Sequence, residues 1–276
     1  MRKMNKLVAL AMAMVLVFLG GEALAAGKSQ KSASPVLNRI LAKKELVVGT
    51  AASMPPLNMK TKGGEIIGLE IDLARDFAAA MEVKLTLKPM PFKDLLPALE
   101  AGQVDMVLSA MTMTPTRNLK VAFVGPYFAS GKSLLAKLEN VESVNNIEKM
   151  NSPDKVFVAL KGSTSQLFVE TVMPKAKLVL ADDYDRAVAM VLNDQALAMV
   201  ADYPICAVSV VRYPEAKFGM PDKPLTYEPI GIALPPNDTL LINWVQNFLG
   251  GLEKIGGLKR LEDRWMKEGS WINRLP

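Results

Sequence analysis

Short apolar runs alternate along the chain with longer stretches in which apolar residues recur at helical spacing. In the first half, residues 46–50 and 104–108 predict buried strands. Residues 69–81 and 92–101 predict helices, and Gly102 follows the second of them as a stop signal. This order of elements is typical of an α/β fold.

The second half of the chain repeats this order. It contains strand-like runs at 156–160, 177–180 and 197–201 and helical patterns that begin near residues 164 and 184. Strands that alternate with helices predict parallel sheets with helices on both faces. We therefore expect two similar lobes with a cleft between them, and such clefts are preferred places for small ligands.

One stretch, from Val104 to Arg117, changes from an apolar strand to polar residues and then to a new helix. The Thr114–Pro115 pair suits the N-cap and first position of that helix, which places Arg117 in its first turn. Ligands of open α/β sheets sit beyond the carboxyl ends of the strands. A guanidinium and the hydroxyls of Ser109 and Thr112 at such a place would suit a carboxylate. The alternative is a surface arginine beside an ordinary capping loop.

The first 25 residues have the pattern of a secretory signal peptide. A positively charged start precedes an apolar run at 7–19 and the small residues of Ala23-Leu24-Ala25, so we expect cleavage after Ala25 or Ala26. The run is short for a membrane span, and an uncleaved anchor helix is the alternative. The absence of a cysteine near this site excludes lipid attachment there. We expect an exported, periplasmic protein whose polar leader at 26–35 is mobile.

Charge and residue usage exclude several classes of function. Removal of the signal peptide takes three of the 33 basic and one of the 28 acidic residues, so the formal net charge falls from +5 to +3. The remaining charges are interspersed, and nucleic acid is not expected as a partner. The chain has no histidine, which removes histidine-dependent nucleophilic machinery and histidine-ligated metal sites. We expect no cofactor or metal, and the single cysteine, Cys206, reads as a buried core residue.

Short motifs follow one another in order along nearly the whole chain after the leader. They are Gly49-Thr50, Pro55-Pro56, Gly-Leu-Glu-Ile-Asp-Leu-Ala at 68–74, Leu-Leu-Pro-Ala-Leu at 95–99, Gly-Gln-Val-Asp at 102–105, Met-Thr-Met-Thr-Pro-Thr-Arg at 111–117, Pro126-Tyr127, Gly-Ser-Thr at 162–164 and Ala-Asp-Tyr-Pro at 201–204. Together they resemble the family 3 solute-binding proteins of polar amino acid ABC transporters.

The resemblance implies an α/β periplasmic binding protein fold of type II with two lobes, each a mostly parallel sheet flanked by helices. Residues 36–130 and 232–276 would form the first lobe and residues 131–231 the second, with two hinge crossings near residues 129–131 and 229–231. The function implied is capture of an amino acid by hinge closure and delivery to an inner-membrane ABC permease. We expect a monomer without enzyme activity.

Two residues carry the ligand chemistry that the resemblance implies. Arg117 falls on the position that binds the α-carboxylate, and Asp202 falls on the position that receives the α-ammonium. A zwitterion needs a fork of donors and an acceptor, so this pair of side chains is chemically consistent with an amino acid. The alternative for Asp202 is a helix N-cap for the helix that begins at Tyr203.

Other positions complete the implied site. The resemblance gives Thr112 a hydroxyl that assists Arg117, Ser109 a backbone contact, Thr164 a carboxylate contact from the second lobe, and Phe92 a packing role against the ligand side chain. The alternatives are that Thr164 caps its own helix and that Phe92 is a plain core aromatic.

The chain departs from the family pattern at Ala51 and Met54, where the family often has an acidic residue and an aromatic. Without the acidic residue, a basic ligand side chain would lie buried without a partner there. We therefore expect a ligand that is not basic, with Ala51 beside it and Met54 as an adaptable wall of the site.

Two rival functions share this scaffold. A periplasmic dehydratase of the cyclohexadienyl type would need a general acid in the cleft, and Glu70 is the candidate; its alternative is a residue at the start of a helix. A sensory binding module is the second rival.

Overall fold

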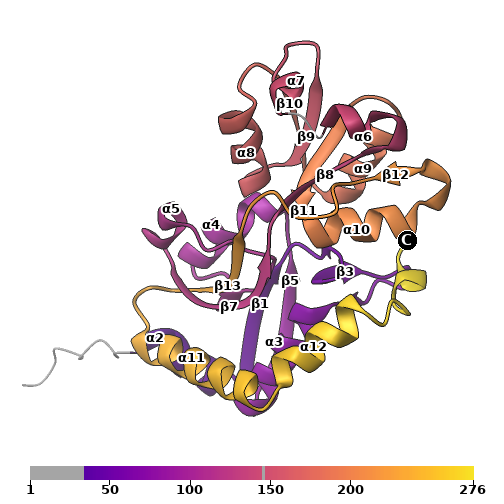
Figure 1. Ribbon diagram of the computed structural model, residues 1–276. Helices are drawn as coiled ribbons and strands as arrows, with labels where there is room; N and C mark the ends of the chain where they lie inside the picture. Colours follow the sequence, from indigo (N-terminus) through magenta and orange to yellow (C-terminus); the bar gives the residue numbers. More distant parts are fainter. Residues whose placement is uncertain (1–33, 145–146) are drawn as a thin grey trace, which may run out of the picture. The chain divides into compact units, whose positions relative to one another are not determined.

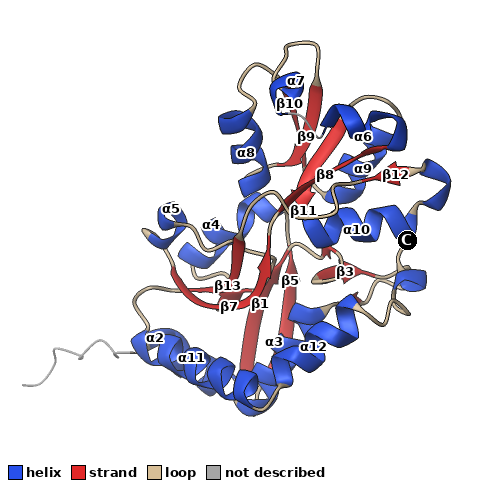
Figure 2. Cartoon of the chain, viewed as in Figure 1, coloured by secondary structure: helices blue, strands red, loops and turns tan. Residues whose placement is uncertain are grey.

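Two five-stranded sheets form the framework of the computed structural model, which describes residues 34–144 and 147–276 (Figure 1). The expected signal peptide and nearly all of the expected leader lie outside these described residues. Figure 2 shows that helices flank both sheets, as the alternating sequence pattern predicts. Within the described residues, no helix is both long and apolar enough to cross a membrane.

The first sheet has the strand order β5-β1-β6-β13-β7. Strands β5, β1 and β6 run parallel, whereas β13 is antiparallel to both of its neighbours. The strands are β1 (Glu45–Thr50), β5 (Lys84–Pro89), β6 (Met106–Val107), β7 (Ala122–Ser130) and β13 (Glu228–Leu234), and the helices are α2 (Pro35–Lys43), α3 (Leu69–Ala80), α4 (Leu95–Glu100), α5 (Pro115–Asn118), α11 (Thr239–Lys254) and α12 (Gly257–Met266). We call this sheet and its helices the first lobe.

The second sheet has the order β10-β9-β11-β8-β12 and the same arrangement of three parallel strands beside antiparallel ones. Its strands are β8 (Lys132–Lys137), β9 (Val156–Leu160), β10 (Lys177–Ala181), β11 (Ala198–Asp202) and β12 (Phe218–Gly219), and its helices are α6 (Leu138–Val144), α7 (Ile147–Met150), α8 (Thr164–Val172), α9 (Tyr184–Leu192) and α10 (Tyr203–Arg212). We call this the second lobe. The α/β fold class and the repeat of one topological unit are therefore confirmed.

A third, small sheet and three short 3-10 segments complete the secondary structure of the described residues. The small sheet lies against the first lobe, and its strand order is β2-β3-β4. The bounds are β2 (Ser53–Met54), β3 (Asn58–Lys60) and β4 (Ile66–Ile67) for the strands, and η1 (Phe92–Asp94), η2 (Pro214–Ala216) and η3 (Ile272–Arg274) for the 3-10 segments.

The chain crosses between the sheets at two adjacent places. Strand β7 passes through Gly131 into β8, and the chain returns between β12 and β13. A Cβ at Gly131 would lie 2.0 Å from the carbonyl oxygen of Thr226, so the two crossings touch at a point that only glycine fits. The second crossing comes before Glu228, slightly earlier in the sequence than residues 229–231, which lie inside β13.

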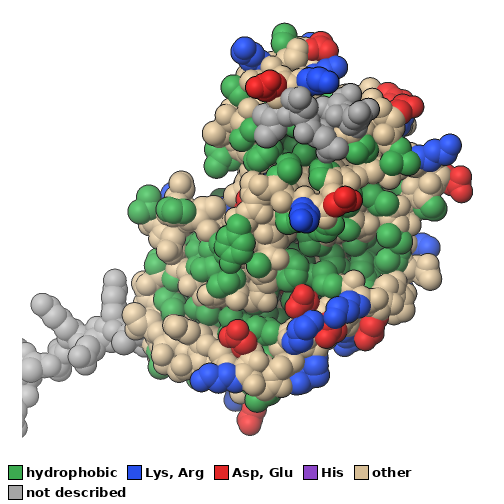
Figure 3. Space-filling view, in the orientation of Figure 1, with side chains coloured by type: hydrophobic (Ala, Val, Ile, Leu, Met, Phe, Trp, Pro, Cys, Tyr) green, Lys and Arg blue, Asp and Glu red, His purple; other side chains and the backbone are tan. Residues whose placement is uncertain are grey.

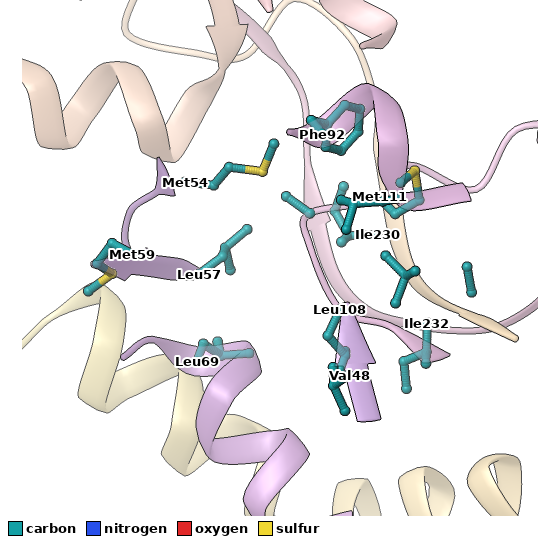
Figure 4. Close-up of a cluster of buried hydrophobic side chains, with 14 of the residues drawn as sticks. Val48, Met54, Leu57, Met59, Leu69, Phe92, Leu108, Met111, Ile230 and Ile232 are labelled. Carbon is teal, nitrogen blue, oxygen red and sulfur yellow. The ribbon is translucent and has the colours of Figure 1, made fainter. Parts of the chain in front are cut away.

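The first lobe has an apolar core that ends at the cleft. In Figure 4, Val48 and Leu69 lie at one end of a buried cluster, whereas Met54 and Phe92 lie at the other. All four side chains are almost fully buried. Core packing therefore fixes two of the expected ligand-contact residues on a rigid base.

One expected strand is shorter than its apolar pattern. Of residues 104–108, only Met106–Val107 pair as strand β6. Asp105 interrupts the run because its buried carboxylate accepts a hydrogen bond from the backbone amide of Val47 and pairs with Arg39. The carboxylate thus anchors the start of the segment that leads to Arg117.

Candidate functional site

Arg117 lies where the two lobes meet. Helix α5 begins at Pro115, and the Thr114 hydroxyl accepts a hydrogen bond from the backbone amide of Arg117 at 3.2 Å, which confirms the N-cap. The guanidinium donates from Nη1 to the carbonyl of Thr112 at 2.9 Å and from Nη2 to the carbonyl of Gly162, in the second lobe, at 3.1 Å. The guanidinium thus spans the boundary between the lobes, and Arg117 is half-buried there.

The surroundings of this guanidinium are partly aromatic and partly anionic. Its carbon lies 5.6 Å from the centre of the Phe92 ring, within the range of a cation–π contact. Burial lowers the pKa of Arg117, and the negative charges of Asp202 and Glu228 oppose this lowering. Asp202 and Glu228 are thus the carboxylates whose charges act on this guanidinium.

Thr112 and Thr164 bring a hydroxyl from each lobe to this point. Their Oγ1 atoms lie 3.3 Å apart. Thr164 is the first residue of α8, but the N-cap is Ser163, whose hydroxyl accepts from the amide of Gln166 at 3.2 Å. The capping alternative for Thr164 is therefore wrong, and its hydroxyl faces the first lobe.

Asp202 ends β11 and precedes α10, as expected, but its side chain has an internal partner. Its Oδ1 accepts a hydrogen bond from Nζ of Lys132 at 2.7 Å, and both side chains are buried. Asp202 occupies the N-cap position of α10, but within the described part of the chain its carboxylate accepts from no helix amide, so the alternative holds for its position and not for a capping bond. A second carboxylate, that of Glu228, lies 3.7 Å from the same Nζ.

Sequence reasoning missed Lys132 and Glu228. Lys132 is the direct partner of Asp202 in the antiparallel register of β8 and β11. Glu228 is the first residue of β13, where the chain returns to the first lobe. A lysine just before the apolar run at 134–136 was the available sign, but its partner depends on strand pairing that the sequence does not display.

Ala51, Met54 and Ser109 form a neighbouring group in the first lobe. The Ser109 hydroxyl accepts from the backbone amide of Ala51 at 2.9 Å and lies 3.8 Å from the sulfur of Met54. Ser109 is completely buried. Its side chain thus shapes the loop, so its hydroxyl is not available to a carboxylate as the strand-end pattern suggested, and its backbone contact with a ligand stays a prediction.

A cavity of about 360 Å³ opens beside this group. Two of the expected site residues, Ala51 and Phe92, line this cavity. Phe92 is therefore both a buried core aromatic and part of the cavity wall. The facing wall carries the carboxyl-bearing residues Asp182, Asp183 and Asp185. These three, which follow β10, were also missed from sequence.

Two of the three carboxylates in that wall already have partners. The carboxylate of Asp183 caps α9 by accepting from the amide of Arg186 at 2.7 Å. The carboxylate of Asp185 accepts from Nη1 of Arg212 at 2.6 Å. These contacts fix the acidic turn in place at the edge of the cavity.

Glu70, the candidate acid of the rival enzyme, is fully buried at the start of α3. Its carboxylate accepts from Asn58 Nδ2 at 2.6 Å, from the amide of Ala110 at 2.6 Å and from the hydroxyl of Tyr127. Burial raises the pKa of Glu70, and the three hydrogen bonds oppose this rise. These contacts hold the loop that follows β6, where Ala110 has a positive φ of 48°.

Two α/β lobes joined by two crossings, with Arg117 between them, define a binding protein of the two-lobed class. The family model of the bacterial extracellular solute-binding proteins, family 3, matches residues 46–268. The chain belongs to this family, which confirms the resemblance of its motifs. It is a solute-binding protein of the kind that serves ABC transporters.

Individual relatives cover most of the chain. The ABC transporter glutamine-binding protein GlnH of Bacillus subtilis strain 168 is 28% identical over 244 residues, which are 87% of this chain and 88% of that protein. The crystal structure of the ancestral amino acid-binding protein AncCDT-1, a precursor of cyclohexadienyl dehydratase, is 34% identical with a TM-score of 0.77 and covers 84% of this chain and 99% of that one. AncCDT-1 is also described as a cationic amino acid solute-binding protein.

One relative is an enzyme. The cyclohexadienyl dehydratase of Pseudomonas aeruginosa PAO1 is 22% identical over 245 residues, which are 89% of this chain and 91% of that protein. The family thus includes both binding proteins and an enzyme on similar chains.

Proposed function

We propose that this protein captures a free amino acid between its two lobes and delivers it to an inner-membrane ABC permease. The observation that carries the proposal is the position of the Arg117 guanidinium, which hydrogen-bonds to Thr112 in one lobe and to Gly162 in the other. A planar fork of donors at this boundary suits a carboxylate that both lobes can touch.

The other site residues extend this arrangement to a whole amino acid. The hydroxyls of Thr112 and Thr164 lie beside the guanidinium and can donate to the α-carboxylate. Asp202 supplies an acceptor for the α-ammonium from the second lobe. A ligand stabilises the closed form only as far as it touches both lobes, so Arg117 and Asp202 act together in hinge closure.

The ligand side chain would enter the cavity beside Ala51 and Phe92. The absence of an acid at position 51 supports a ligand that is not basic. Met54, expected as an adaptable wall, is buried and lies outside the lining of this cavity, with its sulfur 3.8 Å from the Ser109 hydroxyl. The carboxylates of Asp182, Asp183 and Asp185 on the facing wall weigh against this choice, as does the likeness to a cationic amino acid-binding protein. Calorimetry decides between a basic and a non-basic ligand. Arginine that binds more tightly than leucine or glutamine would overturn the non-basic assignment.

Organisation and location follow from the same proposal. The signal peptide would be cleaved after export, which leaves a periplasmic monomer. The expected lobes are residues 36–130 with 232–276, and residues 131–231; we place the second boundary at residue 228, where β13 of the first lobe begins. The absence of nucleic acid as a partner stays a prediction. On the face that Figure 3 shows, positive and negative side chains of described residues intermix.

A thermal-shift screen of the mature chain against the amino acids tests the proposal. A ligand that binds the folded state raises the melting temperature, and calorimetry then gives its affinity. We expect at least one amino acid to raise the melting temperature in the unaltered protein and to lose this effect in Arg117→Met. A screen in which no amino acid has an effect on a folded, monodisperse sample would overturn the proposal.

We propose that the protein is not an enzyme of the dehydratase type. Glu70, the acid considered for that role, is fully buried and accepts three hydrogen bonds from its own chain, which favours a structural role. Assays with prephenate and arogenate test this directly. Turnover that is lost in Glu70→Gln would establish the enzyme instead.

A further inference from the structure

A buried lysine stands behind the carboxylate that is expected to hold the ligand ammonium. Lys132 has a relative exposure of 1%, and its Nζ lies 2.7 Å from Oδ1 of Asp202 and 3.7 Å from Oε2 of Glu228. The backbone of Lys132 is also fixed, because its amide donates to the Thr226 hydroxyl at 2.9 Å and its carbonyl accepts from Leu225 at 2.7 Å. Both the backbone and the side chain of Lys132 are therefore held in place at the site.

The ion pair between Lys132 and Asp202 changes which α-substituent the ligand needs. A lone buried carboxylate in a closed cleft is costly unless a cation meets it, so it would demand a ligand with an ammonium group. Here Lys132 already provides that cation to one oxygen of Asp202. The second oxygen needs only a hydrogen-bond donor, and a hydroxyl can donate as well as an ammonium can.

The charges around the site lead to the same conclusion. Arg117 and Lys132 face the carboxylates of Asp202 and Glu228, so the four charges sum to zero before any ligand enters. The ligand carboxylate is attracted by Arg117 whether or not the ligand also carries an ammonium. Glu228 Oε2 is buried without a hydrogen-bond partner within the described residues and has the Lys132 Nζ 3.7 Å away as its cation.

We propose that the site accepts α-hydroxy acids as well as α-amino acids of the same side chain, and that Lys132 is the residue that permits this. The inference rests on the proposed function, since it places the ligand carboxylate at Arg117 and the α-substituent at Asp202. The hydroxyl of such a ligand would donate to the free oxygen of Asp202, in the place of the ammonium.

The test compares amino acids with their hydroxy counterparts by calorimetry. Suitable pairs are leucine with 2-hydroxy-4-methylpentanoate, methionine with 2-hydroxy-4-(methylsulfanyl)butanoate, and lysine with 6-amino-2-hydroxyhexanoate. In the unaltered protein, we expect the hydroxy acid to bind no more than about tenfold more weakly than the amino acid. In Lys132→Met we expect the ratio to exceed about 100-fold, because Asp202 then lacks a cation when the hydroxy acid binds.

Lys137→Met is the matched control, since it removes a lysine from the same strand whose partner is the exposed carboxylate of Asp194. Its ratio should stay that of the unaltered protein. The ratio in the unaltered protein tests the inference even where Lys132→Met does not fold. If the hydroxy acid binds more than about tenfold more weakly than its amino acid in the unaltered protein, the inference is overturned and the proposed function stands. If neither member of any pair binds and the amino acid screen also fails, the proposed function is overturned and this inference with it.

Discussion

Thr112 of the first lobe and Thr164 of the second lobe lie with their hydroxyl oxygens 3.3 Å apart. Thr112 is fixed by a bridge to Ile230 in β13, and Thr164 by its place in the first turn of α8. The Arg117 guanidinium joins the same place through Nη1, which donates to the carbonyl of Thr112. Contact between the lobes and contact with a ligand carboxylate therefore depend on the same few atoms.

Replacement of Thr164 by valine removes its hydroxyl without a change in shape. We expect amino acid affinity to fall by about 1 kcal/mol, or five- to tenfold, because one donor to the carboxylate and one contact between the lobes are lost. Thr171→Val, at an exposed position of the same helix, is the control and should bind as the unaltered protein does. Equal weakening in both variants would show that the helix, not the hydroxyl, matters.

Replacement of Arg117 by methionine should have the largest effect on binding. It leaves the ligand carboxylate buried without a cation, which costs about 3 kcal/mol or more and weakens binding at least about 100-fold. Calorimetry measures the loss, and circular dichroism checks the fold. Lys120→Met removes an exposed charge three residues further on and should leave the affinity unchanged; a similar loss there would contradict a direct role for Arg117.

The part of the site that sequence could predict is the part made by local signals. Thr114 and Pro115 predict the start of a helix, so Arg117 could be assigned to its first turn without knowledge of the fold. The length of β6 could not be predicted, because Asp105 pairs with Arg39, which lies 66 residues earlier.

The part that sequence could not predict depends on pairing between distant strands. Asp202 could be recognised as a polar residue at a strand end, but its partner Lys132 lies 70 residues away and meets it through the register of β8 and β11. Glu228 joins them because the second crossing returns at the same place. The acidic turn at 182–185 follows β10, the edge strand of the second sheet, and lines the cavity together with residues of the first lobe.

Ala51→Asp should shift ligand preference toward basic amino acids. The new carboxylate would line the cavity and give a ligand cation a buried partner. We expect the affinity for arginine to rise about tenfold relative to that for glutamine, as a competition experiment would measure. Ala51→Asn has nearly the same shape without the charge and should not shift the ratio; if it does, shape rather than charge sets the preference.

Replacement by alanine should have opposite effects on stability at two glycines, Gly131 in a crossing between the lobes and Gly250 in helix α11. A Cβ at Gly131 would lie 2.0 Å from the Thr226 carbonyl, so Gly131→Ala should lower the free energy of unfolding by about 2 kcal/mol or more and weaken binding through the hinge. A Cβ at Gly250, inside α11, would have no atom within 4 Å among the neighbours described, so Gly250→Ala should stabilise by up to about 1 kcal/mol. Urea unfolding measures both; a stable Gly131→Ala would mean that the crossings are loosely packed.

Glu70 should give the protein a pH dependence that Glu70→Gln removes. Burial raises its pKa above the ordinary value of 4.5, so the folded state binds more protons at this group than the unfolded state does. The free energy of unfolding therefore falls as pH rises from 4.5 through the raised pKa of the folded state. In Glu70→Gln, the change in this free energy between pH 4.5 and neutral pH should be smaller than in the unaltered protein.

The same variant should be less stable at both pH values. The carboxylate accepts from Asn58, Ala110 and Tyr127, whereas a glutamine presents one acceptor oxygen and must turn an NH₂ group toward one of these donors. We expect a loss of about 1–3 kcal/mol from this mismatch. Glu100→Gln, at an exposed helix end, is the control and should keep the pH dependence of the unaltered protein. If Glu70→Gln also keeps it, the dependence belongs to other carboxyl groups, such as Asp76, whose pKa burial also raises.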